Sequence, residues 1–249
     1  MTNLRKIILA LALLGFVACV LMLGFYYWNS GKAQRAFERL ENNRPVYHLP
    51  AVSAQESTTE EENPLDNPDC VGWISIADTK ISYPVMQRAG ENTYYLRRNF
   101  AGKYSESGTP FLDIKCDLAV PESPLYIFGH NMKSGTMFAD LLQYRDPEFE
   151  QNHAIIELET AEGIEYYQIF SVLETSTGTD ELGIYDFAGN PERDLEEFCQ
   201  NLRQKSLYEM KSTANGRLLI LITCTNSYDE AGRFYVAARQ IEKEDLNNF

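Results

Sequence analysis

The residues best suited to chemistry lie near the C-terminus, in the stretch LLILITCTNSYDEAGRFYVAA (218–238). An apolar run ends at Cys224, a mostly polar stretch follows, and Arg233 begins a second apolar run. A thiol becomes a nucleophile only as the thiolate, which a nearby positive charge favours. A guanidinium is always charged, and its fork of donors suits a carbonyl oxygen that gains negative charge. The pair therefore indicates nucleophilic attack on a carbonyl group.

Four other cysteines are weaker candidates for the nucleophile. Cys19 lies in an apolar N-terminal run, Cys199 lies on the apolar stripe of an expected helix, and Cys70 and Cys116 flank expected strands. Free cysteine is among the most buried residue types, so core packing or a loop position accounts for these residues. The sequence has no Cys-x-x-Cys pair and no metal-finger spacing, so neither a metal site nor a cofactor is expected.

Three histidines could supply a general acid and base. His48 lies near a polar linker, and His153 precedes a strand, where a cap or surface position explains it. His130 ends the apolar run LYIFGH, so it stands, like Cys224, where a buried strand gives way to polar residues. A short connection between antiparallel strands would bring Arg233 alongside Cys224. We therefore expect His130, Cys224 and Arg233 to meet at one end of a sheet or barrel.

Eight short runs rich in β-branched and aromatic residues follow residue 65, separated by Gly, Pro, Asn and Asp. Eight strands with only short helices between them predict a mostly β fold, a closed or nearly closed barrel. A short helix is expected over 136–143 and a longer one over 192–206. The expected strands are 71–76, 81–87, 109–114, 124–130, 154–160, 164–174, 217–224 and 233–241.

The N-terminal region is typical of a membrane anchor. Ile7–Tyr27 is a run of 21 residues without a charge, long enough to cross a bilayer, and Trp28 extends its aromatic end. The run is too long and ends in side chains too bulky for a cleaved signal peptide, so an uncleaved anchor over 7–28 is expected. Basic residues flank both sides and do not decide its orientation. A short cytoplasmic N-terminus (1–6) and a large domain outside are favoured.

Residues 29–64 are expected to form a helix and a linker before a single domain over 65–249. Apolar residues at helical spacing in 32–42 predict a short helix docked on the domain, and the Ser/Thr/Glu-rich stretch 50–64 reads as a solvated linker. The net charge of −14 and the lack of a basic stripe disfavour nucleic acid as a partner. A hydrophobic share of 44% argues against a disordered chain.

Together these residues resemble the sortases, the membrane-anchored cysteine transpeptidases of Gram-positive bacteria. The family pattern TLxTC corresponds to the segment ending in Thr223-Cys224, with an arginine nine residues after the cysteine. Further segments resemble class B in particular, in chain order: NPDCVGWISI (67–76), TKISYPVMQ (79–87), NTYYL (92–96), GTPFLD (108–113) and GHNMKSGTMF (129–138). The helix at 192–206 corresponds to the class B insertion between late strands.

The resemblance implies an eight-stranded sortase-type barrel and a thiol mechanism. Cys224 would attack the carbonyl at the Thr-Gly or Thr-Asn bond of a C-terminal sorting signal and form a thioester. His130 would protonate the leaving amine and later deprotonate the incoming one, and Arg233 would hold the developing oxyanion. By the same resemblance, the sorting-signal groove would be lined by Asn92, Leu96 and Thr223.

The partners implied are secreted proteins with a C-terminal sorting signal, a peptidoglycan precursor or pilin amine, and the plasma membrane. Thr225 departs from the acidic residue that follows the cysteine in some class B enzymes, which leaves the sorting motif open. Two rival interpretations share these residues. One is a thiol hydrolase or protease that releases the acyl group to water, and the other is a membrane-anchored binding domain whose cysteine is incidental.

Overall fold

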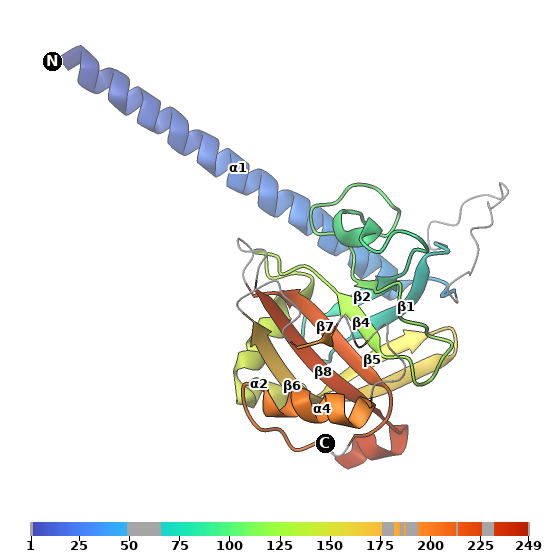
Figure 1. Cartoon of the computed structure of the whole chain (residues 1–249). Coiled ribbons are helices and arrows are strands. Elements are labelled where there is room, and N and C mark those ends of the chain that lie inside the picture. Colours follow the sequence, from blue (N-terminus) through green and yellow to red (C-terminus); the bar gives the residue numbers. More distant parts are fainter. Residues whose placement is uncertain are drawn as a thin grey trace.

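The structure is a computed structural model of the 249-residue chain that describes residues 2–48, 66–175, 182–184, 187, 194–212, 214–225 and 232–248. The predicted linker at 50–64 and most of the connection between Cys224 and Arg233 lie outside the described residues. The folded domain is a β-barrel, and the C-terminal part of one long helix packs beside it (Figure 1).

Eight strands close into the barrel in the order β1-β2-β3-β4-β7-β8-β6-β5, which confirms the predicted fold class. Most neighbours are antiparallel, but β2 pairs with β3 and β4 pairs with β7 in parallel. The strands are β1 (Cys70–Ser75), β2 (Ser82–Met86), β3 (Phe111–Leu112), β4 (Leu125–Phe128), β5 (Ile155–Thr160), β6 (Gly163–Thr175), β7 (Leu218–Cys224) and β8 (Arg233–Ile241).

The burial of strand β7 explains why its sequence is continuously apolar. Residues 218–223 are all buried, on both faces of the sheet. One face points into the barrel, and the 3₁₀ helix η2 (Phe138–Arg145) contacts β7 and β8 from outside. Strands covered on both faces read as unbroken hydrophobic runs rather than alternating ones. The run therefore ends at Cys224 because the strand reaches the rim of the barrel there.

Helix α4 (Leu195–Gln204) packs against β6 and buries Phe198, Cys199 and Leu202, as its apolar stripe predicts. It begins at Leu195 because the Asp194 side chain accepts hydrogen bonds from the next turn, as an N-cap does. A further helix, α2 (Pro147–Asn152), was not predicted. It is capped in the same way by Asp146, followed by a proline at the first helical position.

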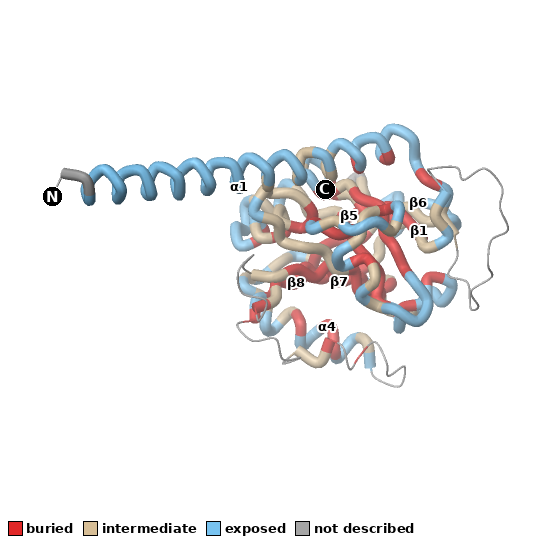
Figure 2. Tube along the Cα trace, turned by 90° about the horizontal axis from the view of Figure 1, so that it is seen from above, coloured by how far each residue is buried: buried red, intermediate tan, exposed pale blue. Residues whose placement is uncertain are grey.

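The segment predicted as an anchor and the predicted short helix form one continuous helix, α1 (Thr2–Asn42). No proline or strong break separates the two segments, so the backbone passes through Asn29, Ser30 and Gly31 without interruption. The C-terminal half docks on the barrel through the buried side chains of Phe37 and Leu40. The N-terminal half projects alone and fully exposed (Figure 2).

The exposed half of α1 is compatible with a membrane anchor. Its most apolar window has a mean hydropathy of 2.9, and none of that window is buried in the protein. Side chains of this kind lower the free energy only when they leave water. The docked half, in contrast, makes specific contacts, including an edge-to-face contact between Phe37 and Tyr83 with ring centroids 5.3 Å apart.

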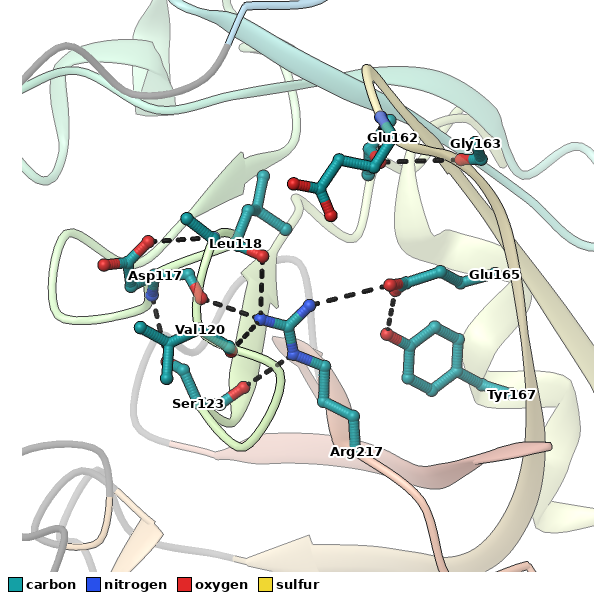
Figure 3. Close-up of polar contacts among 11 residues, drawn as sticks. Asp117, Leu118, Val120, Ser123, Glu162, Gly163, Glu165, Tyr167 and Arg217 are labelled. Carbon is teal, nitrogen blue, oxygen red and sulfur yellow. Dashed lines mark hydrogen bonds and ion pairs between the residues drawn. The ribbon is translucent and has the colours of Figure 1, made fainter. Parts of the chain in front are cut away.

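A buried arginine fixes the connection between β3 and β4 at the far end of the barrel (Figure 3). The Arg217 side chain is 3% exposed and forms an ion pair with Glu165 at 3.7 Å. Its guanidinium also donates to the backbone carbonyl oxygens of Asp117, Leu118, Val120 and Ser123. One side chain thus closes the loop whose beginning, at Asp113, lies against the site described next.

Candidate active site

Three strand ends meet at one rim of the barrel. Strands β4 and β7 run parallel with Phe128 opposite Ile222, so their carboxyl ends lie together. His130 and Cys224 each follow this pair by two residues. Strand β8 runs antiparallel to β7 with Arg233 directly opposite Cys224. The topology therefore brings an imidazole, a thiol and a guanidinium to the same edge.

The sulfur of Cys224 lies beside a fixed cation. Nη1 of Arg233 donates to Sγ of Cys224 at 3.6 Å, and the same nitrogen donates to the carbonyl oxygen of Gly232 at 3.1 Å. Both side chains are half-buried, so they are held by the rim and still reach solvent. A guanidinium at this distance favours negative charge on sulfur and can also donate to an oxygen bound next to it.

His130 is held by a segment far from it in the sequence. Its Nε2 donates to the carbonyl oxygen of Leu96 at 2.8 Å, and its own carbonyl accepts from the Phe138 amide at 2.9 Å. Leu96 belongs to the 3₁₀ helix η1 (Tyr94–Arg97). Because Nε2 carries a proton in this contact, Nδ1 is the nitrogen that can gain or lose one.

One open cavity of about 650 Å³ occupies this rim and is lined by all the predicted site residues. The structure thus brings together residues that are up to 141 positions apart in sequence (92 and 233). The predicted residues on its walls are Asn92, Leu96, His130, Thr223, Cys224 and Arg233. Apolar wall is supplied by Leu96, which is partly exposed, and by Phe111 and Ile222.

Two of the predicted groove residues also hold the walls in place. Thr223 is buried, with 2% of its surface exposed. Its hydroxyl donates to the carbonyl oxygen of Gly129 at 2.7 Å and so ties β7 to the end of β4. The Asn92 amide donates to Asp113 at 2.9 Å, and its oxygen accepts from the Ile114 amide at 3.0 Å. These contacts fix two parts of the cavity wall, one next to the thiol and one formed by residues 92 and 113–114.

The sequence reasoning missed two supporting residues. Nδ2 of Asn131 donates to the carbonyl oxygen of Cys224 at 3.1 Å, which fixes the backbone that carries the thiol. Asp113 orients Asn92, as described above. Asn131 directly follows His130 and so lies within a segment already singled out. Asp113 is 21 residues from Asn92, and only the fold shows that they touch.

Gly108 lies directly against the carbonyl group that holds His130, and Gly108→Ala should disturb that carbonyl. Its φ is +59°, and an added Cβ would collide with the carbonyl oxygen of Leu96 and lie 2.7 Å from that of Tyr95. We expect the free energy of unfolding to fall by about 2 kcal/mol or more, from left-handed strain plus the collision. We also expect kcat to fall, because the Leu96 carbonyl moves.

The matched control is Gly90→Ala. Gly90 also has a positive φ, +81°, but nothing lies within 4 Å of an added Cβ. It should therefore show only the left-handed strain, about 1 kcal/mol. Denaturant unfolding and steady-state kinetics of both variants check this prediction. Equal behaviour of the two variants would contradict the effect expected from the close approach of Gly108 to the Leu96 carbonyl.

Burial makes three other thiols poor nucleophiles. It raises the pKa of Cys70 and of Cys116 to about 12, and it raises the pKa of Cys199 as well. These thiols stay protonated near neutral pH, whereas the half-buried Cys224 reaches solvent.

Iodoacetamide should therefore modify Cys224 first when the full chain is treated in vesicles, with activity lost in parallel. Peptide mapping by mass spectrometry, including the exposed Cys19 in α1, measures the order of modification. Loss of activity with the label on Cys70 or Cys116 and an intact Cys224 would contradict this assignment.

Comparisons with known proteins agree with this architecture. The family model described as "Sortase domain" matches residues 74–241. Sortase B of Listeria monocytogenes is 35% identical over 183 residues, which cover 71% of this chain and 72% of the relative.

Two solved structures are also similar. A Staphylococcus aureus sortase B–substrate complex is 29% identical, with a TM-score of 0.63 over 71% of this chain and 82% of that one. Sortase B from B. anthracis in complex with AAEK1 is 25% identical, with a TM-score of 0.68 over 87% of this chain and 100% of that one. With the barrel and the match over residues 74–241, these likenesses show that the chain belongs to the sortase family, and to class B within it.

Proposed function

We propose that this sortase is a cysteine transpeptidase that uses Cys224 as nucleophile, His130 as acid and base, and Arg233 as oxyanion donor. The observation that carries the proposal is the contact of 3.6 Å between Arg233 Nη1 and Cys224 Sγ, in a cavity that His130 also lines. The substrate is a C-terminal sorting signal of a secreted protein. The acceptor is an amine of a peptidoglycan precursor or a pilin.

In the first half-reaction, the Cys224 thiolate attacks the carbonyl carbon of the threonine in the sorting signal. The carbonyl oxygen becomes an oxyanion, which accepts hydrogen bonds from the Arg233 guanidinium. The C–N bond then breaks, and protonated His130 gives its Nδ1 proton to the leaving amine. The products are a thioester on Cys224, a neutral imidazole and the released C-terminal peptide.

In the second half-reaction, an amine attacks the thioester carbon. The neutral His130 takes a proton from the attacking nitrogen, and the oxyanion forms again beside Arg233. Collapse of this intermediate expels the Cys224 thiolate and leaves a new amide bond. The thiolate and the imidazolium with which the cycle began are restored, so charge and protons balance.

The substrate groove is proposed to follow the cavity wall formed by Asn92, Leu96 and Thr223. The similar Staphylococcus aureus structure is a complex with a substrate, which supports a peptide groove in this fold. The Leu96 side chain offers apolar contact, and the Asn92–Asp113 pair fixes the wall next to it.

We infer further that α1 anchors the enzyme as a single span with the barrel outside the cell. The proposed organisation is a cytoplasmic N-terminus at 1–6, an anchor at 7–28, the docked part of α1 with a linker to 64, and the catalytic domain at 65–249. An apolar stretch long enough to cross a bilayer supports the span. Tethering would raise the effective concentration of substrates held in the same membrane.

A panel of labelled sorting peptides, with and without an oligoglycine amine, tests the proposed function. Transpeptidation predicts an amide product that appears only with the amine. A thiol hydrolase would release the acid at the same rate with or without the amine. An incidental cysteine in a binding domain predicts no cleavage of any peptide. Either of the last two results would overturn the proposal.

Arg233→Lys should lower kcat/KM by about 10²-fold or more, the usual cost of losing an oxyanion donor. The lysine keeps the charge but cannot present two donors in a fixed plane. Full activity of this variant would refute the role given to Arg233.

Arg145→Lys is the control for replacing a guanidinium, with its two coplanar donors, by an ammonium group. Arg145 makes a bidentate pair with Glu174, with contacts of 2.9 and 2.8 Å, and is not among the residues that line the cavity. Its replacement should leave kcat/KM unchanged. The comparison of the two variants separates the loss of a fork at the site from a general effect of replacing arginine.

A further inference from the structure

Helix α1 passes directly beside the active-site cavity. Tyr26, at the end of the apolar run of α1, lines this cavity together with Cys224 and His130. Tyr26 also lines a second cavity of about 600 Å³, which lies between α1 and residues 99–107. The two cavities share Tyr26, Glu106 and Met132 and are therefore neighbours. The end of the proposed span therefore lies at the wall of the active-site cavity.

This position along α1 corresponds to the surface of a bilayer. Tyr27 and Trp28 are largely exposed at the end of the uncharged run, and polar Asn29 and Ser30 follow. Tryptophan and tyrosine gather at the level of the lipid headgroups. Figures 1 and 2 both show the barrel alongside the C-terminal half of α1, while the N-terminal half extends alone. With α1 as the proposed anchor, the barrel therefore begins at the level where the hydrocarbon would end.

The chain beside α1 at this level has the chemistry of a membrane surface contact. Tyr104 is 74% exposed, next to the exposed Lys103. Residues 92–105 include three basic residues and no acidic one, although the whole chain has a net charge of −14. Among the residues that line the second cavity, two are basic, Lys32 and Arg39 of α1, and one is acidic, Glu106. Anionic lipids attract such basic clusters.

We propose that residues 97–104, with the adjoining part of α1, form a contact surface for the headgroups of the anionic bilayer that holds the anchor. This contact makes α1 more than a tether, because it sets the open rim of the barrel against the membrane. A sorting signal that is still held in the bilayer by an apolar segment then reaches Cys224 from the side of the lipid. The inference rests on the membrane anchor of the proposed function.

Lipid quenching of tryptophan emission tests the surface in the full chain, reconstituted in phosphatidylcholine–phosphatidylglycerol vesicles that contain brominated lipid. In a Trp28→Phe background, the one remaining native tryptophan is Trp73, which is buried. Tyr104→Trp then reports on the proposed surface. Leu207→Trp reports on an exposed position just beyond α4 and is the matched control. We expect brominated lipid to quench the emission of Trp at 104 by at least about twofold more than that of Trp at 207.

Each outcome bears on one claim. Equal, weak quenching of both reporters would overturn the surface. A change at position 104 on addition of a sorting peptide, without any quenching by lipid, would also overturn it and would show a contact for protein instead. The wild-type chain tests the anchor separately, because Trp28 should be quenched if α1 spans the bilayer. Quenching of Trp28 without quenching at 104 keeps the anchor and removes the surface.

A charge variant tests the electrostatic part of the contact. Lys103→Glu in the Tyr104→Trp reporter should reduce quenching on anionic vesicles and change it little on phosphatidylcholine alone. Neither Lys103 nor Tyr104 is among the residues that line the active-site cavity, so cleavage of a soluble peptide should stay unchanged. Cleavage of a substrate anchored in the same anionic vesicles should fall by about fivefold or more, since the loss of one basic residue near such a surface is worth about that factor and the new carboxylate adds repulsion. Equal cleavage of the anchored substrate by the Tyr104→Trp reporter with and without Lys103→Glu would contradict the proposed surface.

Discussion

Cys224→Ala is expected to reduce the cleavage of sorting peptides by about 10⁴-fold or more, the scale of loss when a covalent nucleophile is removed. In the proposed mechanism the sulfur forms the thioester, and the side chain lies at the rim of the barrel rather than in its core. The free energy of unfolding should therefore change little. Peptide cleavage assays and denaturant unfolding of the same preparation measure both effects.

The matched control for this prediction is Cys199→Ser. Cys199 lies in α4, where Arg239 donates to its sulfur at 3.1 Å, and a serine hydroxyl can accept the same hydrogen bond. Activity should be retained in this variant. If Cys224→Ala kept its activity while Cys199→Ser lost it, the nucleophile would have been assigned to the wrong thiol.

His130→Gln should lower kcat by about 10³-fold or more, because neither the leaving nor the attacking amine can exchange a proton with an amide side chain. Glutamine still carries an N–H donor for the Leu96 carbonyl, so the change removes the titrating group while keeping a polar side chain. The pH–rate profile should also lose the limb that histidine contributes. Kinetics over a range of pH measure both effects.

The control is His153→Gln. His153 also donates to a backbone carbonyl, from Nδ1 to Phe149 at 2.7 Å, but it lies at the end of α2 and is not among the residues lining the cavity. Its pH–rate profile should match that of the unchanged enzyme. A profile that keeps its histidine limb in His130→Gln would show that another group exchanges the proton.

The strands could be predicted because their sequences carry the burial pattern directly. Strand β7 is covered on both faces, so its apolar run is unbroken, and the run stops where the rim begins, at Cys224. The β7–β8 pair follows from one short connection between two such runs. The local sequence therefore sufficed to predict that Cys224 and Arg233 lie side by side at the ends of paired strands.

The contacts across the site could not be predicted in this way. Leu96 holds His130 across 34 residues, and Asp113 holds Asn92 across 21. Such contacts depend on how the chain between β2 and β4 folds back over the rim, and no periodicity in the sequence records that path. Gly108 is informative only once its φ of +59° and its contact with the Leu96 carbonyl are known.

The N-terminal helix shows a different limit. An uncharged run indicated a membrane anchor, and apolar periodicity indicated a docked helix; the structure has a helix over both segments, exposed over the first and docked through Phe37 and Leu40 of the second. The two segments form one continuous helix because no helix-ending residue separates them. The absence of such a residue is only a weak signal in a sequence. The consequence for the proposed function is large, because Tyr26 of this continuous helix lines the candidate active-site cavity.

Trapping of the acyl-enzyme tests the central claim most directly. The full chain is mixed with a labelled sorting peptide in the absence of an amine, quenched in acid, digested and mapped by mass spectrometry. The proposed mechanism predicts the mass of the N-terminal peptide fragment on Cys224, and its disappearance with formation of an amide when oligoglycine is added before the quench. An acyl group on any other residue, or peptide cleavage that persists in Cys224→Ala, would contradict it.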